Sequence, residues 1–256
     1  MTVKDENIGI IVQARTGSTR LHNKIVKPFY NGLTILDIIL ERVKSNRYGA
    51  LVVLATSTNP SDTALEKVAK HHNIPFFKGD EQNVLKRFVD AADYFGFSTI
   101  MRVCSDNPFL HLNSIDELIG EYTRNPADYI SFMNGEMVPV IRTHLGLFTE
   151  IISVAALKKT QQLTSEALFC EHVTNYIYTH PENFKVKLLP LPSFLKNRND
   201  IRLTIDTLED FEILSELYSA FIADASNFDI KSLVDFIDNN LALLEGMKNS
   251  IVKNSK

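Results

Sequence analysis

The sequence predicts an α/β fold in which a largely parallel sheet is covered by helices on both faces. Two observations lead to this fold class. Short apolar runs rich in β-branched residues alternate with amphipathic stretches of helical periodicity along the first half of the chain. The apolar runs also lack polar alternation, so both faces of the strands they form are expected to be buried.

Residues 8–125 contain four such pairs of strand and helix. The expected strands are 8–14, 50–56, 74–79 and 99–106, and the expected helices are 35–46, 61–72, 83–95 and 114–123. Ile35 and Ile39 illustrate the helical spacing of the apolar positions. Ser61 and Asn113 are residue types that cap the start of a helix, and Gly96 is the type that ends one.

The rhythm becomes less regular after residue 125. We expect strands at 127–133, 145–153, 184–192 and 201–206, and helices at 165–180, 207–222 and 230–246. Residues 247–256 are expected to form a flexible tail. The pattern contains no internal repeat and indicates a single domain over residues 1–250.

Composition and charge exclude several classes of protein. The chain has 256 residues, 45% of them hydrophobic, and a net charge of −4, which argues against a general binder of nucleic acids or membranes. Cys104 and Cys170 form no CxxC pair and no disulfide framework, which favours a reducing compartment. The N-terminus lacks the apolar stretch of a signal peptide, and no apolar run reaches membrane-spanning length. We therefore expect a cytoplasmic protein.

A basic loop follows the first strand directly. Its cations are Arg15, Arg20, Lys24 and Lys27, and no acidic residue occurs between Ile8 and Leu36. Gly17 lets the backbone approach a ligand, while Ser18 and Thr19 offer hydroxyl and amide groups. Because ligands bind beyond the carboxyl ends of parallel strands, this loop is expected to cradle phosphate. It matches neither GxGxxG nor GxxxxGK[ST], and a solvated basic turn is the alternative interpretation.

Two acidic residues each follow an expected strand. Asp106 ends the strand at 99–106, and Asp206 ends the strand at 201–206. Two carboxylates at one sheet edge, close to a phosphate loop, are typical of a Mg²⁺ site. Each residue alone is equally suited to cap the helix that follows it.

Three further polar residues allow two interpretations each. Arg87 either reaches the nucleotide or pairs with Asp80 or Asp90. Glu171 and His172 lie on a mostly apolar helix, where a histidine is more often structural than catalytic. The seven histidines and two cysteines show no zinc spacing, and no GxSxG elbow occurs.

Several segments resemble one enzyme family. The stretch VQARTGSTRLHNK resembles the opening motif of the cytidylyltransferases that make CMP-sugars, in particular the spore-coat polysaccharide biosynthesis F family, relatives of CMP-KDO and CMP-sialic acid synthetases. Further segments that resemble this family, in order and at similar spacing, are VVLATSTNPSD, FKGDEQNVLKRFVDAA, RVCSDNPFL, EHVTNYIY and LTIDTLEDFEIL. The resemblance extends from residue 8 to about residue 215.

The resemblance implies the nucleotide-diphospho-sugar transferase fold, a Rossmann-like, GT-A type α/β/α sandwich with a mixed sheet. It implies transfer of CMP from CTP to a sugar-type acceptor, with release of pyrophosphate. It implies that Arg15, Ser18, Arg20 and Lys24 hold the triphosphate, with backbone contacts to the base from Ala14 and from the strand end at 55–57, which includes Ser57. Gly17, Thr19 and Arg87 are further nucleotide-binding candidates that rest on the residues alone. Arg15, Arg20, Lys24 and Asp106 would be catalytic, and Asp106 and Asp206 would hold Mg²⁺.

The resemblance also divides the domain. Residues 8–125 would bind the nucleotide, 126–215 would bind a small anionic acceptor and form a homodimer, and 216–246 would close the fold. Glu150, Glu171 and His172 are the acceptor-binding candidates. Phe148 stands where the family has an Asp, which suggests a different acceptor or altered activity.

Three alternatives remain open at this level. A sister enzyme of the same fold would use another NTP with a sugar 1-phosphate, but such enzymes usually open with a Gly-rich loop. A glycosyltransferase would commonly carry Asp-x-Asp, which this sequence lacks. A catalytically silent nucleotide- or sugar-binding homologue is suggested only by Phe148.

Overall fold

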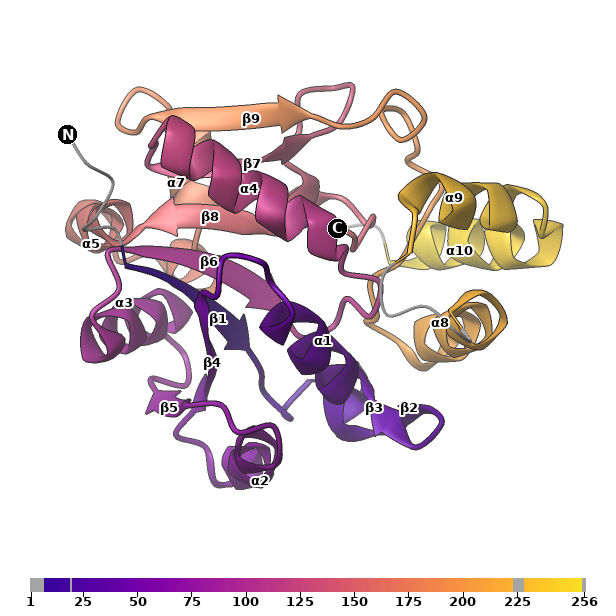
Figure 1. Ribbon diagram of the computed structural model, residues 1–256, viewed down its shortest axis with the longest axis horizontal. Helices are drawn as coiled ribbons and strands as arrows, with labels where there is room; N and C mark the ends of the chain where they lie inside the picture. Colours follow the sequence, from indigo (N-terminus) through magenta and orange to yellow (C-terminus); the bar gives the residue numbers. More distant parts are fainter. Residues whose placement is uncertain (1–6, 19, 223–227, 255–256) are drawn as a thin grey trace.

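A seven-stranded sheet runs through the middle of the molecule in the order β5-β4-β1-β6-β8-β7-β9 (Figure 1). The computed structural model describes residues 7–18, 20–222 and 228–254. Its main strands are β1 (Ile8–Gln13), β4 (Leu51–Ser57), β5 (Phe76–Gly79), β6 (Thr99–Cys104), β7 (Tyr129–Met133), β8 (Glu150–Ser153) and β9 (Val186–Pro190). Within this sheet only β8 runs antiparallel to its neighbours. The predicted mixed α/β sheet is confirmed.

Helices cover both faces of the sheet, as Figure 1 shows. They are α1 (Ile35–Lys44), α2 (Ala64–His71), α3 (Val84–Phe95), α4 (Leu112–Arg124), α5 (Val154–Leu163), α6 (Ala167–Glu171), α7 (Asn175–Thr179), α8 (Leu208–Phe221), α9 (Ile230–Asp238) and α10 (Leu241–Lys253). Alternate residues of β1 face opposite layers, as the period of two in a strand requires. Ile10 and Val12 pack in the core shared with α1, α4 and α8–α10, while Ile11 packs in the core shared with α3, α5 and α7.

A small hairpin after the basic loop was not predicted. Strands β2 (Pro28–Tyr30) and β3 (Leu33–Thr34) pair antiparallel around Asn31 and Gly32. These two residues have φ angles of 47° and 81°. Asn-Gly at the centre of a two-residue turn is a strong hairpin signal, so the sequence did contain the information.

The second half of the chain departs most from expectation. Residues 201–206 form no strand. The expected helix at 165–180 is two short helices, α6 and α7. The expected strand at 145–153 is limited to β8, and the expected helix at 230–246 divides into α9 and α10. These segments lie next to irregular loops. Their backbone groups therefore have no continuous neighbouring strand or helical turn with which to form hydrogen bonds.

The C-terminal tail was also predicted wrongly. Helix α10 continues to Lys253, and Met247 and Ser250 are both buried. These buried side chains pack the end of the chain onto the domain. Tertiary contacts, and not the local sequence, therefore decide that this segment is helical. Residues 255 and 256 lie outside the described part.

Two helix starts differ from the predicted caps. Helix α4 begins at Leu112 after His111, so Asn113 is inside it. Ahead of α2, the 3-10 turn η2 (Pro60–Thr63) is capped by the side chain of Asn59, which accepts from the Ser61 amide. Gly96 ends α3 with a φ of 69°, as predicted.

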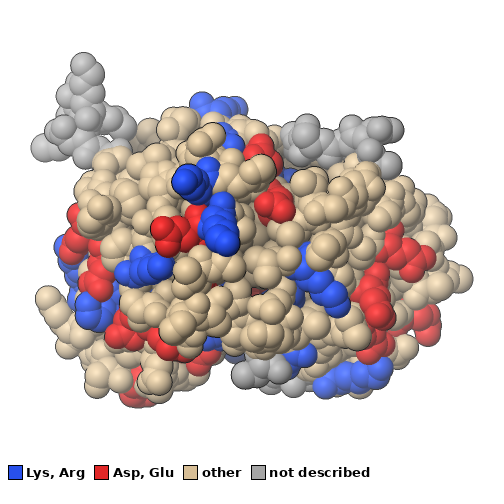
Figure 2. Space-filling model, turned by 90° about the horizontal axis from the view of Figure 1, so that it is seen from below, with Lys and Arg blue, Asp and Glu red and all other residues tan. Residues whose placement is uncertain are grey.

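The surface is mixed in charge. On the face shown in Figure 2, basic and acidic side chains are interspersed and no extended area carries one sign. Among the described residues, no helix combines the length and apolar character needed to cross a membrane.

Candidate active site

The basic loop is anchored to the end of β4 by a buried carboxylate. Asp62 is 1% exposed and accepts from the amide and hydroxyl of Thr16, both at 2.7 Å, and from the Ser57 hydroxyl. Burial raises the pKa of Asp62, but the hydrogen bonds from Ser57 and Thr16 outweigh it and leave that pKa below its ordinary value. The loop therefore leaves β1 with a fixed starting geometry. Asp62 is a residue that the sequence reasoning missed.

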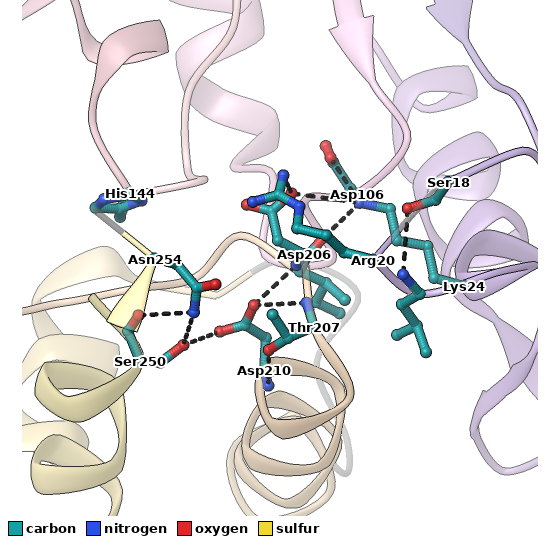
Figure 3. A network of polar contacts seen from close by, with 12 residues as sticks. Ser18, Arg20, Lys24, Asp106, His144, Asp206, Thr207, Asp210, Ser250 and Asn254 are labelled. Atoms are coloured by element: carbon teal, nitrogen blue, oxygen red, sulfur yellow. Dashed lines mark hydrogen bonds and ion pairs between the residues drawn. The ribbon is translucent and has the colours of Figure 1, made fainter. Parts of the chain in front are cut away.

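Two cations of the loop meet the two predicted carboxylates (Figure 3). Nη2 of Arg20 lies 2.6 Å from Oδ1 of Asp206. Nζ of Lys24 lies 3.1 Å from Asp106 and 3.8 Å from Asp206, and it also donates to the carbonyl of Ile205. The structure thus brings together Arg20, Lys24, Asp106 and Asp206, as the sequence predicted.

Asp206 reaches this place without a strand. The Ile205 amide donates to the carbonyl of Asp106 at 3.1 Å, and the Leu203 amide donates to the carbonyl of His144 at 2.8 Å. These single hydrogen bonds hold residues 201–206 against two loops instead of along a strand. The predicted pairing of the two carboxylates at one edge is therefore correct, although one of the two predicted strands is not.

The two carboxylates fit a divalent cation. Both approach the Lys24 ammonium, so a single positive charge already lies between them. Oxygen ligands of this kind suit Mg²⁺, which usually takes one or two protein carboxylates and completes its shell with phosphate and water. No cluster of three or more His, Cys, Asp or Glu side chains able to hold a metal occurs in residues 7–18, 20–222 and 228–254. A metal here would complete its coordination with water or with the phosphates of a bound nucleotide.

Arg87 is a buried cation without a partner. Its side chain is fully buried, and none of its three guanidinium nitrogens has a hydrogen-bond partner among the described residues. Neither Asp80 nor Asp90 forms the ion pair considered from the sequence. Burial, and then the charge of Arg15, lower the pKa of Arg87. Since a buried charge normally requires a partner, this donor group indicates a ligand.

A cavity of about 540 Å³ opens beside the two carboxylates. Its lining includes Asp106, Asp206, Arg102, Arg142, His144 and His172. Phe148 also lines it and packs against Phe132, with ring centroids 4.8 Å apart. Burial raises the pKa of Cys104, another lining residue, to about 11, so its thiol stays protonated.

Glu150 does not line this cavity. It is fully buried and accepts from Arg102 at 2.6 Å, from Tyr129 at 2.7 Å and from Thr174. Burial, then the charge of Glu150, raise the pKa of Tyr129 well above its ordinary value. Glu150 therefore lies behind the cavity lining and holds Arg102 and Thr174, which belong to that lining. Its predicted contact with an acceptor stays a prediction, and this placement favours an indirect role.

The other predicted residues are placed as follows. Arg15 and Glu171 form an ion pair at 3.6 Å, and both are about half exposed. Glu171 is not part of the cavity lining, unlike His172. The Ala14 amide donates to Ala55, and the Ser18 hydroxyl accepts a long hydrogen bond from Leu21. Thr19 lies outside the described residues. A Cβ at Gly17 would meet no atom within 4 Å.

Two missed residues shared one signal. Arg102 interrupts the mostly apolar run TIMRVC, and Arg202 stands between the apolar residues Ile201 and Leu203 of IRLTID. A cation in such a run must find a buried partner, and both do. That reasoning would have found them from the sequence.

The comparison with protein families matches residues 9–248 to a model described as cytidylyltransferase. The chain belongs to the cytidylyltransferase family. It is 38% identical to an uncharacterized protein of Methanocaldococcus jannaschii over 90% of each chain. It is also 33% identical to the spore coat polysaccharide biosynthesis protein SpsF of Bacillus subtilis, over 83% of this chain and 86% of that one.

A solved structure supports the same cytidylyltransferase assignment. A cytidylyltransferase from Leptospira borgpetersenii superposes with a TM-score of 0.83 at 29% identity, covering 93% of this chain and 97% of that one. The family and fold predicted from the sequence motifs are thereby confirmed. As a family member, the chain is a nucleotidyltransferase.

Proposed function

We propose that the protein transfers CMP from CTP to a small anionic sugar-type acceptor and releases pyrophosphate, with Mg²⁺ as the cofactor. The observation that carries this proposal is the meeting of Arg20 and Lys24 with Asp106 and Asp206 at the mouth of a cavity of about 540 Å³. Two cations suit the triphosphate, two carboxylates suit the metal, and the cavity accommodates a second substrate.

The residues of the chain have separate roles in the proposed reaction. Arg20 and Lys24 would leave the carboxylates for the phosphate oxygens, where they neutralise the charge that develops on the leaving pyrophosphate. Asp106 and Asp206 would hold Mg²⁺, which would supply positive charge to offset the negative charge of the reacting phosphates. The loop anchored by Asp62 fixes where the phosphates lie, and this positioning supplies much of the rate of a displacement at phosphorus.

Arg87 supports the choice of a nucleotide ligand. Burial and then the charge of Arg15 lower the pKa of Arg87, and the charge of Asp62 raises it, so both the loop and its anchor lie within electrostatic range of the guanidinium. Cytosine offers two adjacent acceptors, the carbonyl oxygen and a ring nitrogen, that suit a guanidinium. We assign Arg87 to the base or its sugar, because a bound ligand would satisfy the donors that are otherwise buried without partners.

The cavity supports an anionic acceptor. Arg142 lines it and makes no ion pair with any described carboxylate, and Arg102, whose guanidinium pairs with the buried Glu150, is a second lining cation. Guanidinium groups recognise carboxylate or phosphate in a bidentate manner. Phe148 adds an apolar wall in place of the acid that the family carries there. The acceptor would therefore combine one anionic group with an apolar face.

Calorimetric titration tests the proposal. Purified protein would be titrated with CTP, UTP, GTP and ATP, each with and without Mg²⁺. Selective, Mg²⁺-dependent binding of CTP is expected, followed by pyrophosphate release with a panel of sugar acids and sugar phosphates. Selective binding of another nucleotide would move the protein to a sister group, and binding of none would make it a silent homologue.

The role in the cell follows from the same proposal. Activated CMP-sugars supply surface polysaccharides, and CTP is a cytoplasmic nucleotide, so we assign the protein to cytoplasmic synthesis of such precursors. A homodimer is proposed from the family resemblance. Light scattering at micromolar concentration would measure its mass directly, and a mass near the 29.0 kDa of one chain would contradict it.

A further inference from the structure

Arg202 is a buried cation that touches both sides of the site. Its side chain is 1% exposed and forms a two-pronged ion pair with Asp210, at 2.7 and 3.0 Å. The same guanidinium contacts Asp206 at 2.9 Å and Nδ1 of His144 at 2.6 Å. One planar group therefore connects a proposed metal ligand with a residue of the cavity wall.

Asp210 is itself held from three directions (Figure 3). It accepts from the backbone amides of Asp206 and Thr207, at 2.9 and 2.8 Å, as the third residue of the α8 capping box. It also accepts from the hydroxyl of Ser250, which comes from α10. The C-terminal helix thus ends in direct contact with the carboxylate that orients Arg202.

The two oxygens of Asp206 have different partners. Oδ2 faces the buried Arg202, whereas Oδ1 faces Arg20, whose side chain is 45% exposed, and Lys24 at 3.8 Å. Arg202 cannot leave for a phosphate, because its removal would leave the buried Asp210 carboxylate unpaired. Oδ1 is therefore the oxygen that becomes available, while Oδ2 keeps the carboxylate aimed.

We propose that Arg202 and Asp210, braced by Ser250 of α10, are positioning residues that aim the Asp206 carboxylate at the metal and fix His144 at the cavity wall. This inference rests on the proposed function, in which Asp206 binds the metal. Groups behind a metal ligand commonly change metal affinity by about 10–100-fold when removed, although they touch neither metal nor substrate. Helix α10 then contributes to the geometry of the active site, through the hydrogen bond from Ser250 to Asp210.

The test separates positioning from simple stability. Ser250→Ala removes one hydrogen bond, and Arg202→Lys keeps the charge but not the fork that reaches two carboxylates at once. Lys253→Ala is the matched control, because Lys253 also joins α10 to α8, through an exposed ion pair with Glu209. Mn²⁺, a paramagnetic substitute for Mg²⁺, is titrated by electron paramagnetic resonance into the full chain saturated with CTP.

We expect Mn²⁺ affinity in the CTP complex to fall about 3–10-fold in Ser250→Ala and about 10–100-fold in Arg202→Lys. Metal-free CTP affinity should stay within twofold of the original protein in both. Lys253→Ala should leave Mn²⁺ affinity unchanged, even if its thermal unfolding shifts as much as that of Ser250→Ala.

Two results would overturn the inference in distinguishable ways. If both variants fold and bind Mn²⁺ as the original protein does, the Arg202–Asp210 pair is only structural, and the proposed function stands. If the original protein binds CTP but no Mn²⁺, the metal site itself is wrong and the positioning role falls with it.

Discussion

Arg20 and Asp206 are separated by 186 positions in the sequence, yet Nη2 of Arg20 lies 2.6 Å from Oδ1 of Asp206. Lys24 makes the same kind of contact with Asp106 at 3.1 Å. The cations suited to phosphate therefore neutralise the carboxylates suited to a metal when no ligand is bound. Binding of the nucleotide should draw the two cations away from the carboxylates, and binding of the metal should displace the same cations. The affinities for nucleotide and metal should therefore be coupled.

The first prediction concerns Lys24→Met. Removing the ammonium between the two carboxylates should strengthen the binding of Mn²⁺ alone about 10-fold, since one competing cation is gone. It should weaken CTP binding by about 10–100-fold, the value of a charge-assisted hydrogen bond. Calorimetry with each ligand separately measures both changes.

Lys27→Met is the control for this prediction. Lys27 comes from the same segment but lies 5.3 Å from the centre of the Phe211 ring and contacts neither carboxylate. It should change neither affinity beyond about twofold. Weaker Mn²⁺ binding by Lys24→Met would contradict the idea that Lys24 competes with the metal for the two carboxylates.

The second prediction concerns the unpartnered Arg87. Arg87→Met should raise the free energy of unfolding of the ligand-free protein by about 1–3 kcal/mol, because a buried charge without hydrogen bonds is removed. The same variant should bind CTP at least 10-fold more weakly. Thermal unfolding with and without CTP gives both quantities.

Arg42→Met is the matched control, and its expected effect on stability has the opposite sign. Arg42 is equally enclosed but donates to the carbonyls of Pro108 and Leu110 and contacts the Tyr218 hydroxyl. Its replacement leaves those acceptors unpaired and should lower the free energy of unfolding by about 1–3 kcal/mol. If Arg87→Met lowers the free energy of unfolding as Arg42→Met does, the buried nitrogens of Arg87 do not indicate a ligand site.

The third prediction is a pH dependence at Asp62. Its pKa in the folded protein is below the ordinary value of 3.8, so the carboxylate contributes stability that is present above about pH 4 and is lost as the pH falls through the folded pKa. Asp62→Asn should therefore be about 1–3 kcal/mol less stable than the original protein at pH 7. The difference should shrink below about pH 4.

Chemical denaturation at several pH values between about 2.5 and 7 measures this difference. Ser57→Ala, which removes one of the donors to Asp62, should show the same trend at smaller amplitude. A stability difference that stayed constant across the range would mean that the Asp62 carboxylate and its pKa are not the cause.

The fourth prediction concerns the acceptor and Arg142. Arg142→Ala should raise the KM for an anionic acceptor about 10–100-fold, with CTP affinity unchanged, because the residue lines the cavity, whereas Arg20 and Lys24 are not among the lining residues. Arg142→Lys should lie between the two, since it keeps the charge but not the planar fork. Steady-state pyrophosphate release at saturating CTP measures the effect.

An acceptor analogue that lacks the anionic group provides the internal control. Its KM should be high in the original protein and should not change in Arg142→Ala. If the variant affects both acceptors equally, Arg142 shapes the cavity and does not recognise the anion.

Much of the fold was predictable because its signals are local. The apolar runs at 8–14, 50–56 and 99–106 and the helices between them form where periodicity places them, as does the Gly96 stop. The limits of α10 and the break between α6 and α7 were not predictable in this way. They depend on which neighbours bury each residue, and Met247 and Ser250 find theirs only in the folded chain.

The sequence by itself determined the family and the presence of a basic loop and two carboxylates, because residue types at fixed spacings encode them. Only the tertiary structure decided their partners. It placed Glu150 behind the cavity lining, left the Arg87 guanidinium without a hydrogen-bond partner among the described residues, and connected Asp206 to the last helix through Arg202. These outcomes depend on burial and on contacts between distant segments, and neither quantity is contained in local spacing.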